Sequence, residues 1–153
     1  EEITDSYEGA NVHVNGINLT EVVKPQHGDT LTETVSRNVD AAAAQGASAG
    51  RSVLSHLNHP NFTWSLGWED FATVPGLQFF EVYNGHPSVH NLGDAERPAT
   101  ERMWDFVNTR RLREPVLKVS PELTRSPRRK DRCWPPVLTT NASPMASRTL
   151  PLA

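Results

Sequence analysis

Two β-prone segments of this chain each run directly into a His-Pro dipeptide. The first covers residues 53–60 and ends at His59-Pro60, and the second covers residues 79–87 and ends at His86-Pro87. Proline has no backbone N–H to donate to a β-ladder, so each strand must end there. Each histidine is therefore expected at a strand end, which is where open α/β folds and barrels gather their chemistry.

Strands and helices are expected to alternate along the chain. Thr30 and Glu33 have the spacing of a capping box at the start of a helix, and Gly46 provides a stop signal. Asn15-Gly16 reads as a turn after a short strand. The alternation favours parallel strands with helical crossovers. The expected strands are 12–14, 53–57, 77–83 and 116–119, and the expected helices are about 31–45, 67–72 and 98–111.

Charge and proline content divide the chain at about residue 113. Residues 1–113 hold 8 Lys/Arg and 15 Asp/Glu, whereas residues 114–153 hold 7 and 3 together with seven of the 12 prolines. We predict one α/β domain over 1–113 and a Pro/Arg/Ser-rich, disordered tail over 114–153. The whole chain has a net charge of −3, so nucleic acid is not an expected partner.

The cysteine content and the hydropathy of the chain bear on its cellular compartment. Cys133 is the only cysteine, so an internal disulfide is impossible and an oxidising compartment is not indicated. No apolar stretch approaches the roughly 18 residues of a membrane span, and no signal peptide is visible. We therefore expect a cytoplasmic protein without a membrane partner, and the sequence makes no prediction of its oligomeric state. The first residue is not Met, and we expect a fragment.

Histidines on or beside the predicted strands are candidate metal ligands. His13, His56 and His59 lie there, and Glu2 lies just upstream of the first. Neutral imidazole and carboxylate are the usual ligands of Zn, Mn or Fe. A parallel sheet can bring the ends of separate strands within ligand distance of one another, even where the residues are far apart in sequence. The alternative is structural, because a histidine beside proline often only caps backbone carbonyls.

Glu81 is a carboxylate within an apolar strand, so it requires a partner. It either orients a ligand histidine or pairs with an arginine. Asn84 stands before Gly85 in what reads as a turn. His27 and His90 lie in polar loops and are expected to be solvated.

Four segments together resemble the PHP domain, the polymerase-and-histidinol-phosphatase family of metal-dependent phosphoesterases. They are residues 1–4, 12–16, 55–62 and 80–87. The resemblance implies a distorted (βα)₇ TIM-like barrel of parallel strands, present here in part and followed by the irregular tail. It implies divalent metal ions bound by Glu2, His13 and His59, with a surrounding pocket of His56, Asn58, Glu81, Asn84 and His86.

The chain also departs from that family. The family opens with a His-x-His strand and closes with an Asp-x-His pair, and this sequence has neither. We therefore expect the middle of a barrel joined to an unrelated tail, as a shifted reading frame would produce. The implied activity is hydrolysis of small phosphorylated substrates by a metal-activated water, with little turnover from these residues alone. An amidohydrolase-type metal hydrolase and a non-catalytic binding scaffold are the alternatives.

Overall fold

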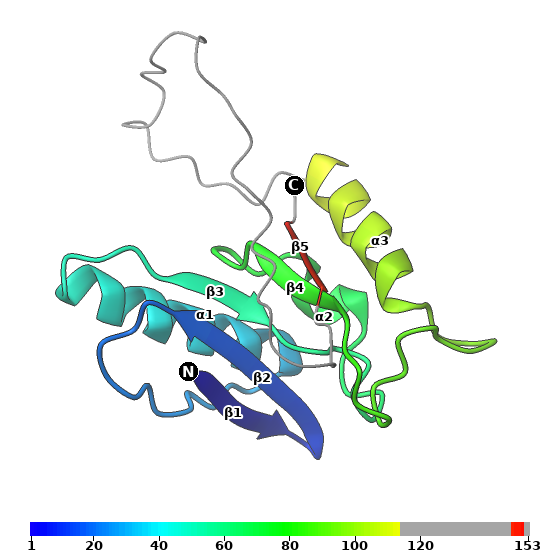
Figure 1. Ribbon diagram of the computed structural model, residues 1–153, viewed down its shortest axis with the longest axis horizontal. Coiled ribbons are helices and arrows are strands. Elements are labelled where there is room, and N and C mark those ends of the chain that lie inside the picture. The colour runs from blue at the N-terminus through cyan, green and yellow to red at the C-terminus, as the bar shows by residue number, and fades with distance from the viewer. Residues whose placement is uncertain (114–147, 152–153) are drawn as a thin grey trace, which may run out of the picture.

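The described strands form one mixed sheet (Figure 1). The computed structural model describes residues 1–113 and 148–151. The five strands lie in the order β1-β2-β3-β4-β5. Helix α1 runs behind β2 and β3, and α3 lies beyond β4 at the other end of the sheet. The elements are β1 (Glu2–Tyr7), β2 (Ala10–Ile17), α1 (Leu31–Ser48), β3 (Leu54–Leu57), α2 (Trp68–Ala72), β4 (Phe79–Tyr83), α3 (Thr100–Arg113) and β5 (Arg148–Pro151).

The predicted parallel (βα)₇ barrel is wrong. Among the described strands, only β3 and β4 pair in parallel, whereas β1–β2, β2–β3 and β4–β5 are antiparallel. The hairpin between β1 and β2 shows the physical reason. Glu8 and Gly9 form its two-residue turn with φ of +49° and +86°, and a connection this short joins only antiparallel strands. The chain therefore builds an open mixed sheet.

Strand β2 is longer than its sequence suggests. Asn15 and Gly16, which read as a turn, lie inside the strand and pair with His56 and Ser55 of β3. Because β2 continues through Asn15 and Gly16, the Asn15 side chain lies on a face of the sheet and not in a turn. As a result Asn15 becomes part of the surface that carries His13.

Helix α1 begins as predicted and ends later. The Thr30 hydroxyl accepts a hydrogen bond from the Glu33 N–H at 3.1 Å, and the Glu33 carboxylate accepts one from the Asp29 N–H at 2.8 Å. Gly46 does not end the helix but is buried within it. A Cβ at this position would lie 2.5 Å from Val53 Cγ2. Gly46 is thus required for close packing against the segment that leads into β3.

The two faces of the sheet have different characters. Val14, Leu57 and Phe80 are fully buried, lie opposite one another across β2, β3 and β4, and pack in one core with residues of all three helices. Side chains alternate between faces along a strand. His13 and His56 therefore lie on the opposite face, away from the helical core.

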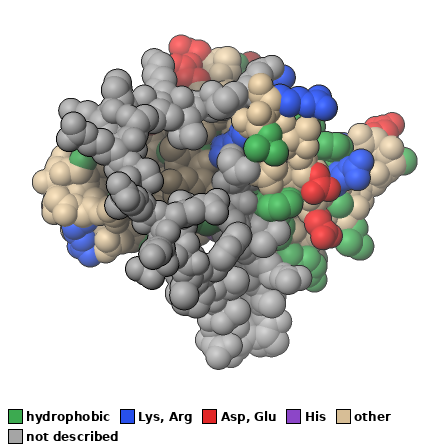
Figure 2. Space-filling model, turned by 90° about the horizontal axis from the view of Figure 1, so that it is seen from above, with side chains coloured by type: hydrophobic (Ala, Val, Ile, Leu, Met, Phe, Trp, Pro, Cys, Tyr) green, Lys and Arg blue, Asp and Glu red, His purple; other side chains and the backbone are tan. Residues whose placement is uncertain are grey.

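Most of the predicted tail, residues 114–147 and 152–153, lies outside the described residues. The expected strand over 116–119, Cys133 and the expected disorder of these residues therefore lie outside them as well. Residues 148–151 form β5 against β4. Over the described part of the surface seen in Figure 2, acidic, basic and apolar side chains are interspersed. Among the described helices, none combines the length and apolar character needed to cross a bilayer.

Candidate metal centre

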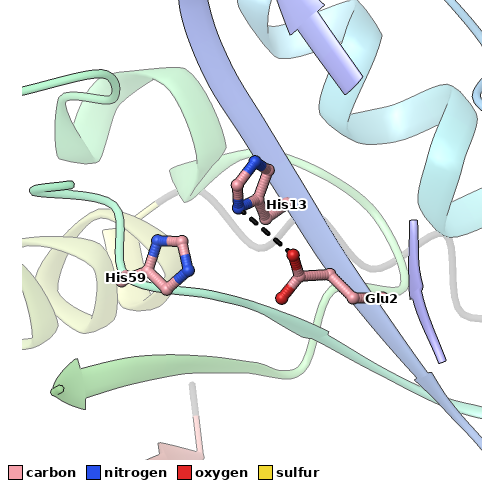
Figure 3. A group of neighbouring side chains, drawn as sticks. All are labelled: Glu2, His13 and His59. Atoms are coloured by element: carbon pink, nitrogen blue, oxygen red, sulfur yellow. Dashed lines mark ion pairs between the residues drawn. The ribbon is translucent and has the colours of Figure 1, made fainter. Parts of the chain in front are cut away.

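Glu2, His13 and His59 converge on one side of the sheet, as the sequence predicted (Figure 3). Each offers one potential ligand atom, and these atoms all lie within 4.8 Å of one another. The three residues come from β1, from β2 and from the segment that follows β3. Residues far apart in the chain thus form a compact group of two imidazoles and a carboxylate.

Strand register explains why the group forms. Thr4 of β1 lies opposite His13 of β2, so Glu2 is the diagonal neighbour of His13 on the same face. The Asn58 N–H donates to the His13 carbonyl at 2.9 Å, which extends the β2–β3 pairing beyond the end of β3. His59 follows at once and is therefore held beside His13.

The distances within the group suit a small ion. His13 Nδ1 lies 3.4 Å from Glu2 Oε1. The His13 and His59 rings are 5.1 Å apart and nearly perpendicular, at 83°. Phe62 packs near both rings, with centroid separations of 6.1 and 5.1 Å. The His13 side chain is 15% exposed and the Glu2 side chain 41% exposed, so the group is open to solvent on the Glu2 side.

The electrostatics favour a neutral His13. Burial lowers the pKa of His13 below its ordinary value, the nearby Glu2 carboxylate opposes this effect, and His59 adds to it. A neutral imidazole has a lone pair for a metal. His13 Nδ1 is buried and accepts or donates no hydrogen bond among the described residues. A buried polar atom without a partner is costly, and a cation between Nδ1 and Glu2 Oε1 would satisfy both.

Two asparagines hold Glu2 in place. Asn58 Nδ2 donates to Glu2 Oε2 at 2.6 Å, and Asn15 Nδ2 donates to Asn58 Oδ1 at 2.9 Å. Asn58 was predicted as a pocket residue and does reach the group. Asn15 was not predicted as a site residue, because the dipeptide Asn15-Gly16 suggested a turn. The alternation of His13 and Asn15 along one strand face is the signal that identifies it.

Glu81 and Asn84 lie behind His59. The Glu81 side chain is buried, and Glu81 Oε2 accepts a hydrogen bond from the His59 N–H at 3.1 Å. Asn84 Nδ2 donates to both Glu81 carboxylate oxygens at 3.1 Å. The buried Glu81 carboxylate thus binds the backbone N–H of His59, one of the candidate ligands.

His56 and His86 stay outside the group of three. His56 is buried on the same face of the sheet, and burial lowers its pKa while Glu81 and Asn58 oppose that shift. His86 is exposed, and its ring lies 5.7 Å from that of Phe62. His86 Nδ1 accepts a hydrogen bond from the Ser88 N–H at 3.1 Å.

The two histidines expected to be solvated both have protein partners. His27 is 75% exposed, yet its Nδ1 lies 2.5 Å from the buried Asp5 carboxylate. His90 stacks on Trp64 at 4.1 Å, with Arg97 3.7 Å from the same ring centroid. These partners are distant in sequence, so local composition gave no indication of them.

Two imidazoles and one carboxylate form a donor set typical of Zn, Mn or Fe sites. Three protein donors leave further coordination positions for water or a substrate oxygen. No family model, curated protein or solved structure matches the chain. The chemistry of this group and the sequence motifs around it are therefore the basis for assigning a function.

Proposed function

We propose that the protein binds one divalent cation, Zn, Mn or Fe, through Glu2, His13 and His59, and that it acts on phosphate esters. The convergence of the three donor atoms within 4.8 Å carries this proposal. A bound divalent cation polarises a phosphoryl oxygen and makes water a better nucleophile.

The chain's own residues prepare this chemistry. Burial keeps His13 in the neutral, ligating form. Glu2 supplies the negative charge of the group, and Asn58 occupies one of its oxygens, so the other is directed at His13. Phe62 forms an apolar wall against both rings and limits water on that side. The exposed side of Glu2 leaves an approach for a small anionic substrate.

The substrate class comes from the motifs around the group. Residues 1–4, 12–16, 55–62 and 80–87 resemble PHP-domain phosphoesterases, and the three candidate ligands lie in the first three of these segments. This supports a small phosphorylated molecule as substrate. Because the strands form an open mixed sheet, the barrel fold of the PHP family gives no support to this proposal. The support comes from the three candidate ligands and the sequence motifs around them.

Metal binding tests the proposal first. Protein comprising residues 1–153 is stripped with a chelator and titrated with Zn²⁺ or Mn²⁺, with bound metal measured by elemental analysis. One ion per chain is expected, and it should be lost in His59→Ala and Glu2→Gln. His90→Gln and Glu8→Gln are matched controls outside the group and should retain the ion. Absence of metal in the wild type, or equal retention in all variants, would favour a non-catalytic scaffold.

Activity tests the substrate class. Metal-loaded protein is assayed on p-nitrophenyl phosphate and bis-p-nitrophenyl phosphate, and on p-nitrophenyl acetate, an amide and a lactone. Turnover is expected to be low, because the described residues bring only three donors together, but confined to the phosphate esters and abolished by His59→Ala. Activity on the amide or lactone alone would indicate an amidohydrolase-type reaction instead.

A further inference from the structure

His59 is held in a backbone conformation that its sequence disfavours. Its φ is +22°, a value that residues other than glycine rarely adopt. Pro60 follows, and a residue before proline normally prefers an extended conformation. Such a conformation persists only where the surroundings enforce it, and it is concentrated at functional sites.

The contacts around His59 identify what enforces this conformation. The Glu81 carboxylate accepts the His59 N–H at 3.1 Å, and the Phe62 N–H donates to the His59 carbonyl at 2.8 Å. Glu81 is 4% exposed and is itself fixed by two hydrogen bonds from Asn84. A hydrogen bond from a backbone N–H to a buried carboxylate is stronger than one between neutral groups.

We infer that Glu81 is a positioning residue of the proposed metal centre, a role that rests on the metal site proposed above. Its carboxylate holds the His59 backbone so that the imidazole is directed at Glu2 and His13 (Figure 3). Among the three candidate ligands, His59 receives this support through its backbone N–H, whereas Glu2 is held by Asn58. We therefore expect Glu81 to affect the cation through the position of His59.

Two substitutions of Glu81 distinguish the effect of its hydrogen bond to His59 from the effect of its negative charge. Glu81→Gln keeps a side-chain oxygen to accept the His59 N–H but removes the negative charge. Glu81→Leu removes both and keeps a similar volume in the buried site. Zinc affinity is measured on protein comprising residues 1–153 by competition with a chromophoric chelator. Glu81→Leu should lose about 10- to 100-fold in affinity, the usual cost of losing support to a ligand. Glu81→Gln should lose clearly less, because its neutral side-chain oxygen can still accept the His59 N–H, although in a weaker hydrogen bond.

A double-mutant cycle with His59→Ala identifies the route of the effect. His59→Ala should not retain zinc through stripping and reloading, but weak residual binding through Glu2 and His13 is measurable at high zinc concentration. If Glu81 acts through His59, then adding Glu81→Leu to His59→Ala should leave this residual affinity unchanged. An equal further loss in that background would overturn the inference and indicate general damage to the fold. Equal losses in Glu81→Gln and Glu81→Leu would also overturn it and assign the effect to charge. No zinc binding by the wild type would instead overturn the metal centre itself.

The metal-free protein gives a second, independent measurement. A charge-assisted hydrogen bond moves an amide proton downfield in NMR spectra. The His59 amide proton should therefore be downfield in the wild type and move upfield in Glu81→Leu. Because this comparison needs no metal, it tests the Glu81–His59 bond separately from the proposed function. An unchanged His59 amide shift in Glu81→Leu would overturn the positioning role.

Discussion

Asn58 donates a 2.6 Å hydrogen bond to one carboxylate oxygen of Glu2, while the other oxygen faces His13 Nδ1 at 3.4 Å. The two oxygens of Glu2 thus have different tasks. One is occupied by the amide, and the other accepts only a long hydrogen bond of 3.4 Å from the Thr4 hydroxyl in addition to facing the imidazole, so it can approach a cation together with His13. Asn15 in turn holds Asn58 through its side-chain oxygen.

Replacing Asn58 with leucine should therefore weaken metal binding. Without the amide, the Glu2 carboxylate can rotate away from His13, and the loss of such a supporting hydrogen bond typically costs about 10- to 100-fold in affinity. Isothermal titration with Zn²⁺ measures the change. Asn11→Leu is the control, because Asn11 lies on the same strand as His13 and its side-chain amide donates to Thr63 and Ser65, outside the group of three. Equal affinity in wild type and Asn58→Leu would show that Asn58 does not support the ligand.

Acid should destabilise the metal-free protein. Burial lowers the pKa of both His13 and His56 below their ordinary value of 6.5. The unfolded chain then binds more protons than the folded chain, so stability is present above pH 6.5 and is lost as the pH falls through the lowered folded-state pKa values. Urea unfolding at pH 7.5 and 5.5 should show the loss.

The same experiment on His56→Gln should give a weaker dependence on pH, because one of the two groups no longer titrates. Glu8→Gln, at the exposed hairpin turn, should keep the wild-type dependence. Stability that rises as the pH falls from 7.5 to 5.5 would contradict the assignment of these shifts to burial.

Gly46→Ala should destabilise the fold although alanine favours helices. The added Cβ would meet Val53 Cγ2 at 2.5 Å and the Arg51 carbonyl oxygen at 2.8 Å. Overpacking of this kind costs about 1–3 kcal/mol, and a clash with a backbone oxygen should lie above the roughly 1 kcal/mol that alanine gains over glycine in a helix. Thermal unfolding of Ala44→Gly provides the comparison, since Ala44 is exposed on the same helix and should lose only the propensity term. A more stable Gly46→Ala would refute the packing requirement.

Arg111 should stabilise the turn after α2. Its guanidinium donates to the carbonyls of Ala72 at 2.8 Å and Leu77 at 2.9 Å, and burial lowers its pKa. Arg111→Met leaves these carbonyls without the guanidinium, at a cost of about 1–3 kcal/mol for each group that stays buried. Chemical denaturation should show a clear loss relative to Arg113→Met, an exposed control on the same helix. Similar stability of the two variants would contradict this role.

The sequence predicted the elements whose signals are local. Thr30 and Glu33 mark the start of α1 through hydrogen bonds within one turn, and His59-Pro60 marks the end of the β3 segment through the missing proline N–H. The three residues that the PHP resemblance implied as ligands, Glu2, His13 and His59, do lie together, but on one face of a mixed sheet and not at the rim of the expected parallel strands.

Strand direction was not predictable in the same way. It depends on the positive φ values of Glu8 and Gly9, and Glu-Gly lacks the Asn or Asp that normally signals a two-residue hairpin. Gly46 was misinterpreted for a related reason: its role depends on contact with Val53, which only the folded chain brings close. The support of Glu2 by Asn15 is likewise a tertiary contact.

Anomalous X-ray diffraction from crystals soaked in Zn²⁺ tests the central claim most directly. One anomalous peak is expected, within about 2.0–2.2 Å of a Glu2 oxygen and of one nitrogen each of His13 and His59. It should disappear in crystals of His59→Ala. A strong peak elsewhere with none at these three residues, or no peak at saturating zinc, would contradict the metal centre.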